Sequence, residues 1–155
     1  IVPGDGGRLM QFVYIRDLVE ACVKALTETN VIGHAFNIGN ERPITQLELV
    51  QALARAGNKK PQIARVPRER IIESGGNPMG DPAYFGHYLD VPPITEAIGK
   101  VKRMLKLTPT PFDEGLKETY RWYLRNFKSP RLKSDFEDKL IALGAESSGL
   151  LHSRI

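Results

Sequence analysis

The amino-acid sequence predicts an α/β fold in which part of a parallel sheet is followed by a group of helices. Short β-prone runs alternate with amphipathic helical segments in the order β-α-β-α-β. A glycine- and proline-rich loop, Ser74–Pro82, then separates this region from segments that have only helical periodicity. Three short strands are too few for an ordinary doubly wound sheet, so the pattern predicts the outer part of one.

The first β-α pair follows a turn signal at Pro3–Gly7. The run Gln11–Ile15 is rich in β-branched and aromatic residues and predicts a strand. A helix is expected over Asp17–Glu28, because apolar residues recur there at helical spacing. Asp17 stands at its start, where a carboxylate caps free amides, so a capping role is favoured over a catalytic one.

The second pair begins with a predicted strand at His34–Ile38. Thr45 and Glu48 then form a capping-box pattern, in which each side chain bonds the backbone amide of the other residue. The pattern predicts a helix over Gln46–Ala56. A third short strand is expected at Gln62–Val66, between two prolines.

Helices fill the remainder of the sequence. Ile94–Lys106 and Pro111–Phe127 each carry one apolar stripe, and Thr110 is expected to cap the second. The aromatic residues of that second stripe are predicted to be core. A terminal helix is expected at Ser134–Leu143. The predicted organisation is therefore a main region, residues 1–128, and a C-terminal helix and tail, residues 129–155.

Composition narrows the class of protein. The chain has 155 residues, 41% of them hydrophobic and 26% charged, which is close to globular averages. The net charge of +4 is spread over both halves, and this mild basicity is typical of many enzymes. Cys22 is the only cysteine, so no disulfide forms within the chain, and a cytoplasmic location is expected. No apolar run spans a bilayer, and no residues have metal-ligand spacing. An opening without Met suggests a processed or excised piece.

Three segments carry a family resemblance, in the right order and at fitting spacing: Pro3–Ala21 (PGDGGRLMQFVYIRDLVEA), Gly33–Asn40 (GHAFNIGN) and Leu105–Tyr123 (LKLTPTPFDEGLKETYRWY). Together they resemble the C-terminal half of the extended short-chain dehydrogenase/reductases, the NAD(P)-dependent sugar epimerases and dehydratases. The resemblance covers roughly residues 2–127. It implies the C-terminal part of a Rossmann-like parallel sheet plus a small helical substrate-binding domain.

Two hallmarks of that family are absent from the sequence. The glycine-rich turn that cradles the dinucleotide phosphates should follow a strand, whereas Gly4–Gly7 precedes one. The family's catalytic Tyr and Lys lie four residues apart, and none of the 5 tyrosines has a lysine four positions later. The resemblance therefore implies no catalytic or cofactor-binding residue here. NAD or NADP would belong to the full-length parent, and whether the chain is itself an enzyme stays open, because alone it should be inactive.

The resemblance also implies a substrate pocket wall, whose candidate residues are Arg8, Met10, Tyr14, Arg68, Arg70, His87 and Tyr88. Nucleotide-sugar members of the family carry a phosphate-binding arginine where this sequence has Met10, and another where Pro78-Met79 precedes Gly80. Bidentate arginine is the usual way to hold phosphate. A sugar-like or other hydroxy or keto compound is therefore expected as substrate, rather than a nucleotide-diphosphate sugar.

Two other functions remain open at this stage. The basic chain could be a non-catalytic module of related fold that binds nucleic acid, although the even charge distribution makes that the weaker reading. It could also be a module that binds a protein partner, and a homo-oligomer is possible. A salt-dependent affinity for nucleic acid would separate the first of these from a substrate-binding role.

Overall fold

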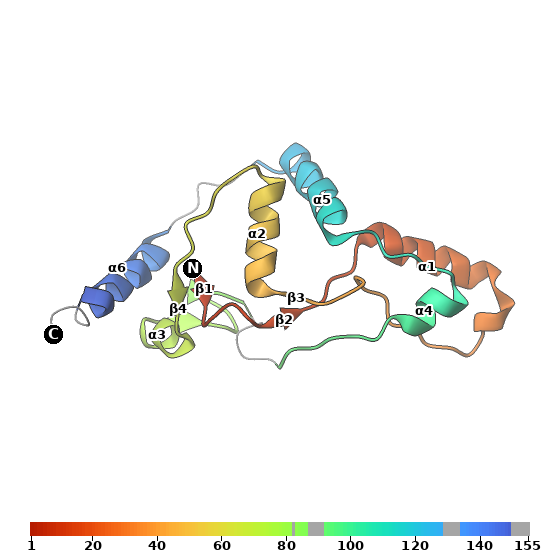
Figure 1. The fold of residues 1–155 in the computed structure, drawn as a ribbon, viewed down its shortest axis with the longest axis horizontal. Coiled ribbons are helices and arrows are strands. Elements are labelled where there is room, and N and C mark those ends of the chain that lie inside the picture. Colours follow the sequence, from red (N-terminus) through yellow and green to blue (C-terminus); the bar gives the residue numbers. More distant parts are fainter. Residues whose placement is uncertain (82, 87–91, 129–133, 150–155) are drawn as a thin grey trace. The chain divides into compact units, whose positions relative to one another are not determined.

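The computed structural model describes residues 1–81, 83–86, 92–128 and 134–149, and within the last helix the side chains up to residue 143. The chain divides into two compact units. The first unit draws on Ile1–Arg8, Pro61–Pro93 and Ser129–Ile155, and the second on Leu9–Lys60 and Ile94–Lys128. Figure 1 shows the elements of both. The domain division expected at residue 128 stays a prediction.

Within its described residues, the first unit holds two small parallel ladders and two helices. Strand β1 (Val2–Pro3) pairs with β4 (Arg65–Val66), and β5 (Gly76–Asn77) pairs with β6 (Ala83–Tyr84). The helices are α3 (Arg68–Glu73) and α6 (Asp135–Gly149). The core of this unit consists of Val66, Ile71 and Leu140, with Phe85 and Phe136 packed against it. A side chain at residue 76 would begin 2.5 Å from Cγ2 of Ile71, so only glycine fits there.

The second unit is mainly helical. Its helices are α1 (Ile15–Thr27), the 3₁₀ turn η1 (Thr29–Val31), α2 (Gln46–Ala56), α4 (Gly99–Met104) and α5 (Phe112–Asn126). Strand β2 (Leu9–Met10) pairs antiparallel with β3 (Ile44–Thr45). Helices α2 and α5 lie side by side (Figure 1). The core lies elsewhere in the unit, among Ala21, Val31, Ile98, Val101, Leu105 and Leu107.

The predicted helices are present, and the capped one is placed best. Helix α2 begins and ends where the sequence predicts, and α1 and α5 shift by one or two residues. Helix α4 is shorter than the expected Ile94–Lys106. The side chain of Gln11 bonds both backbone groups of Glu96, at 2.6 Å to the amide nitrogen and 3.3 Å to the carbonyl oxygen. This clamp holds the backbone of the segment before α4 outside the helix.

Two of the three predicted strands are wrong. Residues 11–14 and 34–38 belong to no ladder, and Ile15 already starts α1. A strand requires a neighbouring strand with which it forms backbone hydrogen bonds. The segment at residues 11–14 and the one that follows residue 34 share one such bond, from the amide of Asn40 to the carbonyl of Phe12 at 2.7 Å. The third predicted strand is present as β4, in a parallel pair as expected. The α/β class is therefore confirmed, with shorter strands than predicted.

The aromatic stripe predicted as core is buried only in part. Phe112 and Tyr120 are half-buried, whereas Tyr123 and Phe127 are 40% and 50% exposed. Tyr123 and Phe127 stack on each other with ring centroids 5.2 Å apart, and the Trp122 ring meets Phe127 edge-on. The last turns of α5 thus present an aromatic surface rather than filling a core.

Candidate functional site

The residues predicted to line a substrate pocket fall in both compact units. Arg8, Arg68 and Arg70 fall in the first unit, the last two on the exposed surface of α3, while Met10 and Tyr14 fall in the second. The two remaining candidates, His87 and Tyr88, lie outside the described residues. The second unit therefore supplies the site geometry that follows.

Met10 is a packing residue. It is only 7% exposed and lies in β2 opposite Ile44 of β3. Pro78, at the second position where a phosphate-binding arginine was expected, is also buried. A guanidinium buried at either position would lose solvation, which is costly unless the charge is paired. Burial at both positions agrees with their apolar character.

Tyr14 joins the start of α1 to α5. Its hydroxyl donates a hydrogen bond to Oε2 of Glu118 at 2.5 Å, and Arg16 reaches the same oxygen at 3.0 Å. The hydrogen bond to Glu118 raises the pKa of Tyr14, and partial burial adds to the shift. A Cβ placed on Gly115 would lie 3.0 Å from the Tyr14 ring, so glycine lets the helix approach the ring. A shallow pocket of about 530 Å³ lies over Tyr14, Arg16, Glu118 and Trp122.

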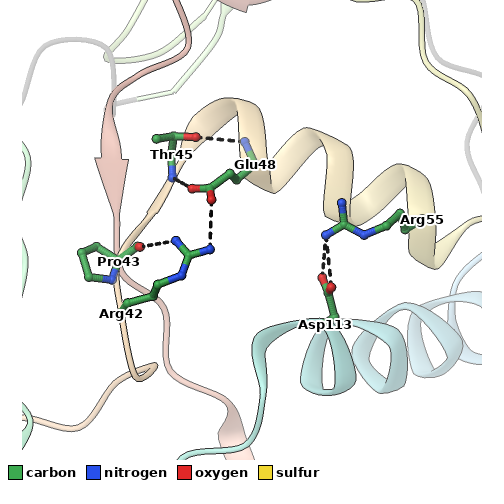
Figure 2. Close-up of polar contacts among 6 residues, drawn as sticks. All are labelled: Arg42, Pro43, Thr45, Glu48, Arg55 and Asp113. Atoms are coloured by element: carbon green, nitrogen blue, oxygen red, sulfur yellow. Dashed lines mark hydrogen bonds and ion pairs between the residues drawn. The ribbon is translucent and has the colours of Figure 1, made fainter.

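A larger polar cleft of about 620 Å³ lies between α2 and the start of α5. Two ion pairs line it (Figure 2). Arg42 bonds Oε1 of Glu48 at 3.0 Å, and Arg55 bonds both carboxylate oxygens of Asp113 at 2.8 and 3.1 Å. Because each guanidinium in the cleft already faces a carboxylate, the lining favours a neutral or hydroxylated ligand over a bare anion.

Asn40 lines this cleft, and the sequence did not single it out for a site. It is 7% exposed, and its Oδ1 atom has no hydrogen-bond partner among the described residues. Its backbone is held on both sides, by Phe12 through the amide and by the Gln11 side chain at 3.0 Å through the carbonyl. No local motif signals these bonds of Gln11 and Asn40.

The capping box at the start of α2 is formed as predicted. Oγ1 of Thr45 accepts from the amide of Glu48 at 3.1 Å, and Oε2 of Glu48 accepts from the amide of Thr45 at 2.7 Å (Figure 2). The hydrogen bond from Arg42, followed by that from the Thr45 backbone, holds the pKa of Glu48 below its ordinary value. The sequence identified Thr45 and Glu48, but it did not identify Arg42 as the third member.

Removing the box should destabilise the second unit in a pH-dependent way. We expect Thr45→Ala to lower the free energy of unfolding by about 1 kcal/mol at neutral pH. Because the pKa of Glu48 is depressed in the folded state, its contribution is present above the ordinary glutamate pKa and is lost as the pH falls through the lower folded value. Urea unfolding from pH 7 to pH 3 should therefore show a shallower acid loss for Glu48→Gln than for the wild type. Glu28→Gln, which removes an exposed carboxylate, is the control. If the free energy of unfolding fell equally with pH in the wild type, Glu48→Gln and Glu28→Gln, the expectation would be contradicted.

Asp17 does not cap α1 as the sequence predicts. Tyr14 occupies the N-cap position without a side-chain cap, and Asp17 lies inside the first turn, 5% exposed. Its carboxylate accepts two hydrogen bonds from Thr110, from the amide at 2.9 Å and from Oγ1 at 2.6 Å. Thr110 therefore does not cap α5, whose N-cap is Pro111. The pair ties α1 to the segment that leads into α5, across 93 positions of sequence.

The described residues contain neither a metal-binding cluster nor a membrane-spanning helix. No group of three or more His, Cys, Asp or Glu side chains lies close enough to hold a metal ion there. Within the same ranges, no helix is both long and apolar enough to cross a membrane.

Comparison with known proteins identifies relatives for most of the chain. The model of the NAD dependent epimerase/dehydratase family matches residues 1–39. A UDP-N-acetyl-alpha-D-glucosaminuronate decarboxylase of Bacillus cytotoxicus is 29% identical over 79% of this chain and 35% of its own length. A dTDP-glucose 4,6-dehydratase of Neisseria gonorrhoeae is 29% identical over 81% and 34%. A dTDP-4-dehydro-6-deoxy-D-allose reductase of a Streptomyces species is 32% identical over 77% and 31%.

Solved structures show the same fold. The UDP-glucuronic acid 4-epimerase of Bacillus cereus in complex with NAD has a TM-score of 0.56 at 21% identity, over 83% of this chain and 34% of that one. An epimerase of Methanothermobacter thermautotrophicus has a TM-score of 0.60 at 21% identity, over 81% and 32%. The chain thus spans about a third of the length of the relatives that it matches. Over most of its length the chain is thus similar to one part of these NAD-dependent epimerases and dehydratases, and the family model itself matches residues 1–39.

Proposed function

We propose that this chain forms the substrate-binding part of an NAD(P)-dependent epimerase, dehydratase or reductase. The observation that carries the proposal is the similarity of most of the chain to about a third of each relative. The sequence also lacks both the dinucleotide turn and the Tyr-x-x-x-Lys pair. The nucleotide, once bound by the intact protein, would accept or give the hydride. The residues of this chain would bind and orient the substrate beside it.

The proposed pocket wall keeps the residues named from the sequence: Arg8, Met10, Tyr14, Arg68, Arg70, His87 and Tyr88. Tyr14 offers a phenol that Glu118 and Arg16 already hold in one orientation, which suits a positioning role. Arg68 and Arg70 lie exposed on α3, where guanidiniums can donate paired hydrogen bonds to a substrate. Met10, being buried, would contribute to the shape of the wall and not to polar contacts.

The substrate that we propose is a sugar or another hydroxy or keto compound that is not held through a diphosphate at positions 10 and 78. Burial of Met10 and Pro78 supports this choice. A nucleotide-linked sugar is the second candidate. The relatives favour this second candidate, because their names include UDP- or dTDP-linked sugars.

Nucleic-acid binding remains the weaker alternative. Several basic side chains of the second unit are already engaged: Lys102 with Glu41, Lys24 with Glu20, and Arg42 and Arg55 with the cleft carboxylates. A surface built for phosphate backbones would instead present such cations to the ligand.

Turnover by the intact protein, as its whole gene encodes it, tests the proposal. With NAD or NADP present, we expect it to convert at least one sugar-like hydroxy or keto compound, and nucleotide-diphosphate sugars more slowly. Rapid turnover of UDP- or dTDP-sugars would select the second candidate. Absence of any nicotinamide-dependent reaction with both substrate classes, together with salt-sensitive binding of RNA or DNA, would refute the enzymatic role.

A further inference from the structure

The polar cleft between α2 and the start of α5 contains an acceptor that has no hydrogen bond. Asn40 lines this cleft and is 7% exposed, and its Oδ1 atom is closed to solvent and unpartnered among the described residues. Phe12 and Gln11 already bond the backbone of Asn40, so only the side chain is left to change its contacts. A buried carbonyl oxygen without a donor is unfavourable, and a ligand donor that reaches it removes this penalty.

The charges of the cleft are balanced. Two arginine–carboxylate pairs line it, as Figure 2 shows. Glu41, the remaining charged residue of the described lining, bonds Nζ of Lys102 at 2.5 Å. A free anion would have to displace a carboxylate from its guanidinium, and a free cation would have to displace an arginine or a lysine. The balance of charge therefore favours a neutral ligand.

The lining still offers both donors and acceptors of hydrogen bonds. Both bonds from Arg55 to Asp113 use Nη2, so this pair leaves the N–H groups of Nε and Nη1 for other acceptors. Gln51, exposed on α2 one turn before Arg55, adds an amide with a donor and an acceptor. A hydroxyl group both donates and accepts, so a compound with several hydroxyl groups satisfies both kinds of partner.

An apolar wall accompanies these polar groups. Ile44 and Ala52 are 5% and 2% exposed, Phe112 is half-buried, and all three line the cleft together with the exposed ring of Pro111. The volume of about 620 Å³ lies within the range of small-molecule sites, about 300–1,000 Å³. A six-membered ring that carries hydroxyl groups at its edge has C–H faces that fit such a wall.

We propose that the cleft lined by Asn40, Gln51 and Arg55 is a binding site for a neutral ring compound with several hydroxyl groups, a free sugar or a cyclitol. One hydroxyl donates to Oδ1 of Asn40, whose amide turns about the Cβ–Cγ bond to meet it. Neighbouring hydroxyls bond Gln51 and Arg55, and the C–H face of the ring contacts the apolar wall. None of these residues belongs to the proposed pocket wall, so this site does not depend on the proposed enzymatic role.

The cleft predicts weak binding. Gln51, Arg55 and Asp113 are exposed, so the hydroxyl groups of a ligand replace hydrogen bonds that these side chains otherwise make to water. We therefore expect a dissociation constant in the millimolar range. Because the ligand is neutral, the affinity should change little with salt.

Titration of the isotope-labelled chain with neutral probes tests the site. The probes are glucose, galactose, mannose and myo-inositol, and the charged analogues are glucuronate and glucose phosphate. At least one neutral probe should shift the side-chain amide signals of Asn40 and Gln51 in nuclear magnetic resonance spectra, and it should bind more tightly than either charged analogue. Tighter binding of a charged analogue, or no shift with any neutral probe, would overturn the proposal. Shifts confined to the proposed pocket wall, such as Tyr14, would overturn it as well, while supporting the proposed substrate role.

Two substitutions test the contacts with the ligand. Asn40→Leu removes the acceptor and keeps the size of the side chain, and Gln51→Ala removes the exposed amide, so each should raise the dissociation constant about tenfold. Asn30→Leu in η1 and Gln62→Ala repeat these changes at exposed positions outside the cleft and should leave the affinity unchanged. Equal effects of the cleft variants and the control variants would overturn the proposal.

The stability of Asn40→Leu distinguishes a binding residue from a structural one. The substitution replaces an unpartnered polar atom by an apolar group, so the midpoint of urea unfolding should stay the same or rise. Added probe should then stabilise the wild type more than the variant. A variant that unfolds at lower urea than the wild type and binds the probe with unchanged affinity would show that the Asn40 side chain serves the fold alone.

Discussion

The 155-residue chain alone should bind neither NAD nor NADP at micromolar concentrations, and it should transfer no hydride. Dinucleotide affinity in folds of this family depends on backbone amides at a glycine-rich strand-to-helix turn and on a side chain that contacts the ribose. The turn at Gly4–Gly7 follows strand β1, which the sequence did not predict, but it leads into strand β2 and not into a helix, so it is not a strand-to-helix turn of this kind. Loss of a positioned acid/base group alone costs roughly 10² to 10⁴ in rate, and loss of the nucleotide removes the hydride source.

Calorimetric titration of the purified chain with each nucleotide is the measurement, followed by the same titration with candidate substrates present. A complete member of the family, titrated in the same buffer, shows that the conditions permit binding. A circular dichroism spectrum with the expected helix content excludes unfolding of the sample as the reason why no binding heat is measured. Micromolar binding of NAD or NADP by the chain would mean that the assignment of the cofactor site to other residues is wrong.

The sequence predicts those parts of the fold that are determined by neighbours in the chain. The sequence predicts both ends of α2 correctly. Its start is signalled by Thr45 and Glu48, which are three residues apart and bond each other's backbone amides. The expected strand at residues 34–38 fails for the opposite reason. A strand is stable only beside a partner, and the described residues offer that segment no ladder. The local sequence reveals the propensity of a segment to form a strand, but it does not reveal whether a neighbouring strand is present to pair with it.

The same division applies to the candidate site. Tyr14 was named from the sequence, but its partner Glu118 lies 104 positions away and no motif links the two. Arg55 and Asp113, which line the polar cleft, are 58 positions apart. Such pairs depend on how α2 packs against α5 and how α1 is held at its start. The residue types that suit a site can therefore be predicted, while their grouping requires the structure.

Breaking the tie between Asp17 and Thr110 should produce the largest loss of stability among single substitutions at polar residues of the second unit. Asp17→Ala removes a buried carboxylate and leaves the amide and hydroxyl of Thr110 without their acceptor. Each unsatisfied buried group costs about 1–3 kcal/mol, so we expect a loss of about 2–4 kcal/mol in the free energy of unfolding. Thr110→Val removes one of the two donors and keeps the backbone bond, so a loss of about 1–2 kcal/mol is expected.

Urea unfolding at a concentration where the chain is monomeric measures these changes. Two controls match the two substitutions. Asp113→Asn breaks the exposed pair with Arg55 and should cost less than about 1 kcal/mol. Thr27→Val removes an exposed hydroxyl on the last turn of α1 and should change little.

The double variant, Asp17→Ala with Thr110→Val, distinguishes the tie from the helix cap that the sequence predicts. A cap acts on amides of α1 itself, so its loss would cost about 1 kcal/mol whatever stands at residue 110, and the two changes would add. The tie predicts the opposite, because after Asp17→Ala the half-buried hydroxyl of Thr110 is a donor without its acceptor, and its removal should cost nothing or restore stability. Additive losses in the double variant would show that Asp17 stabilises α1 alone, and that its contact with Thr110 contributes no coupling between α1 and α5.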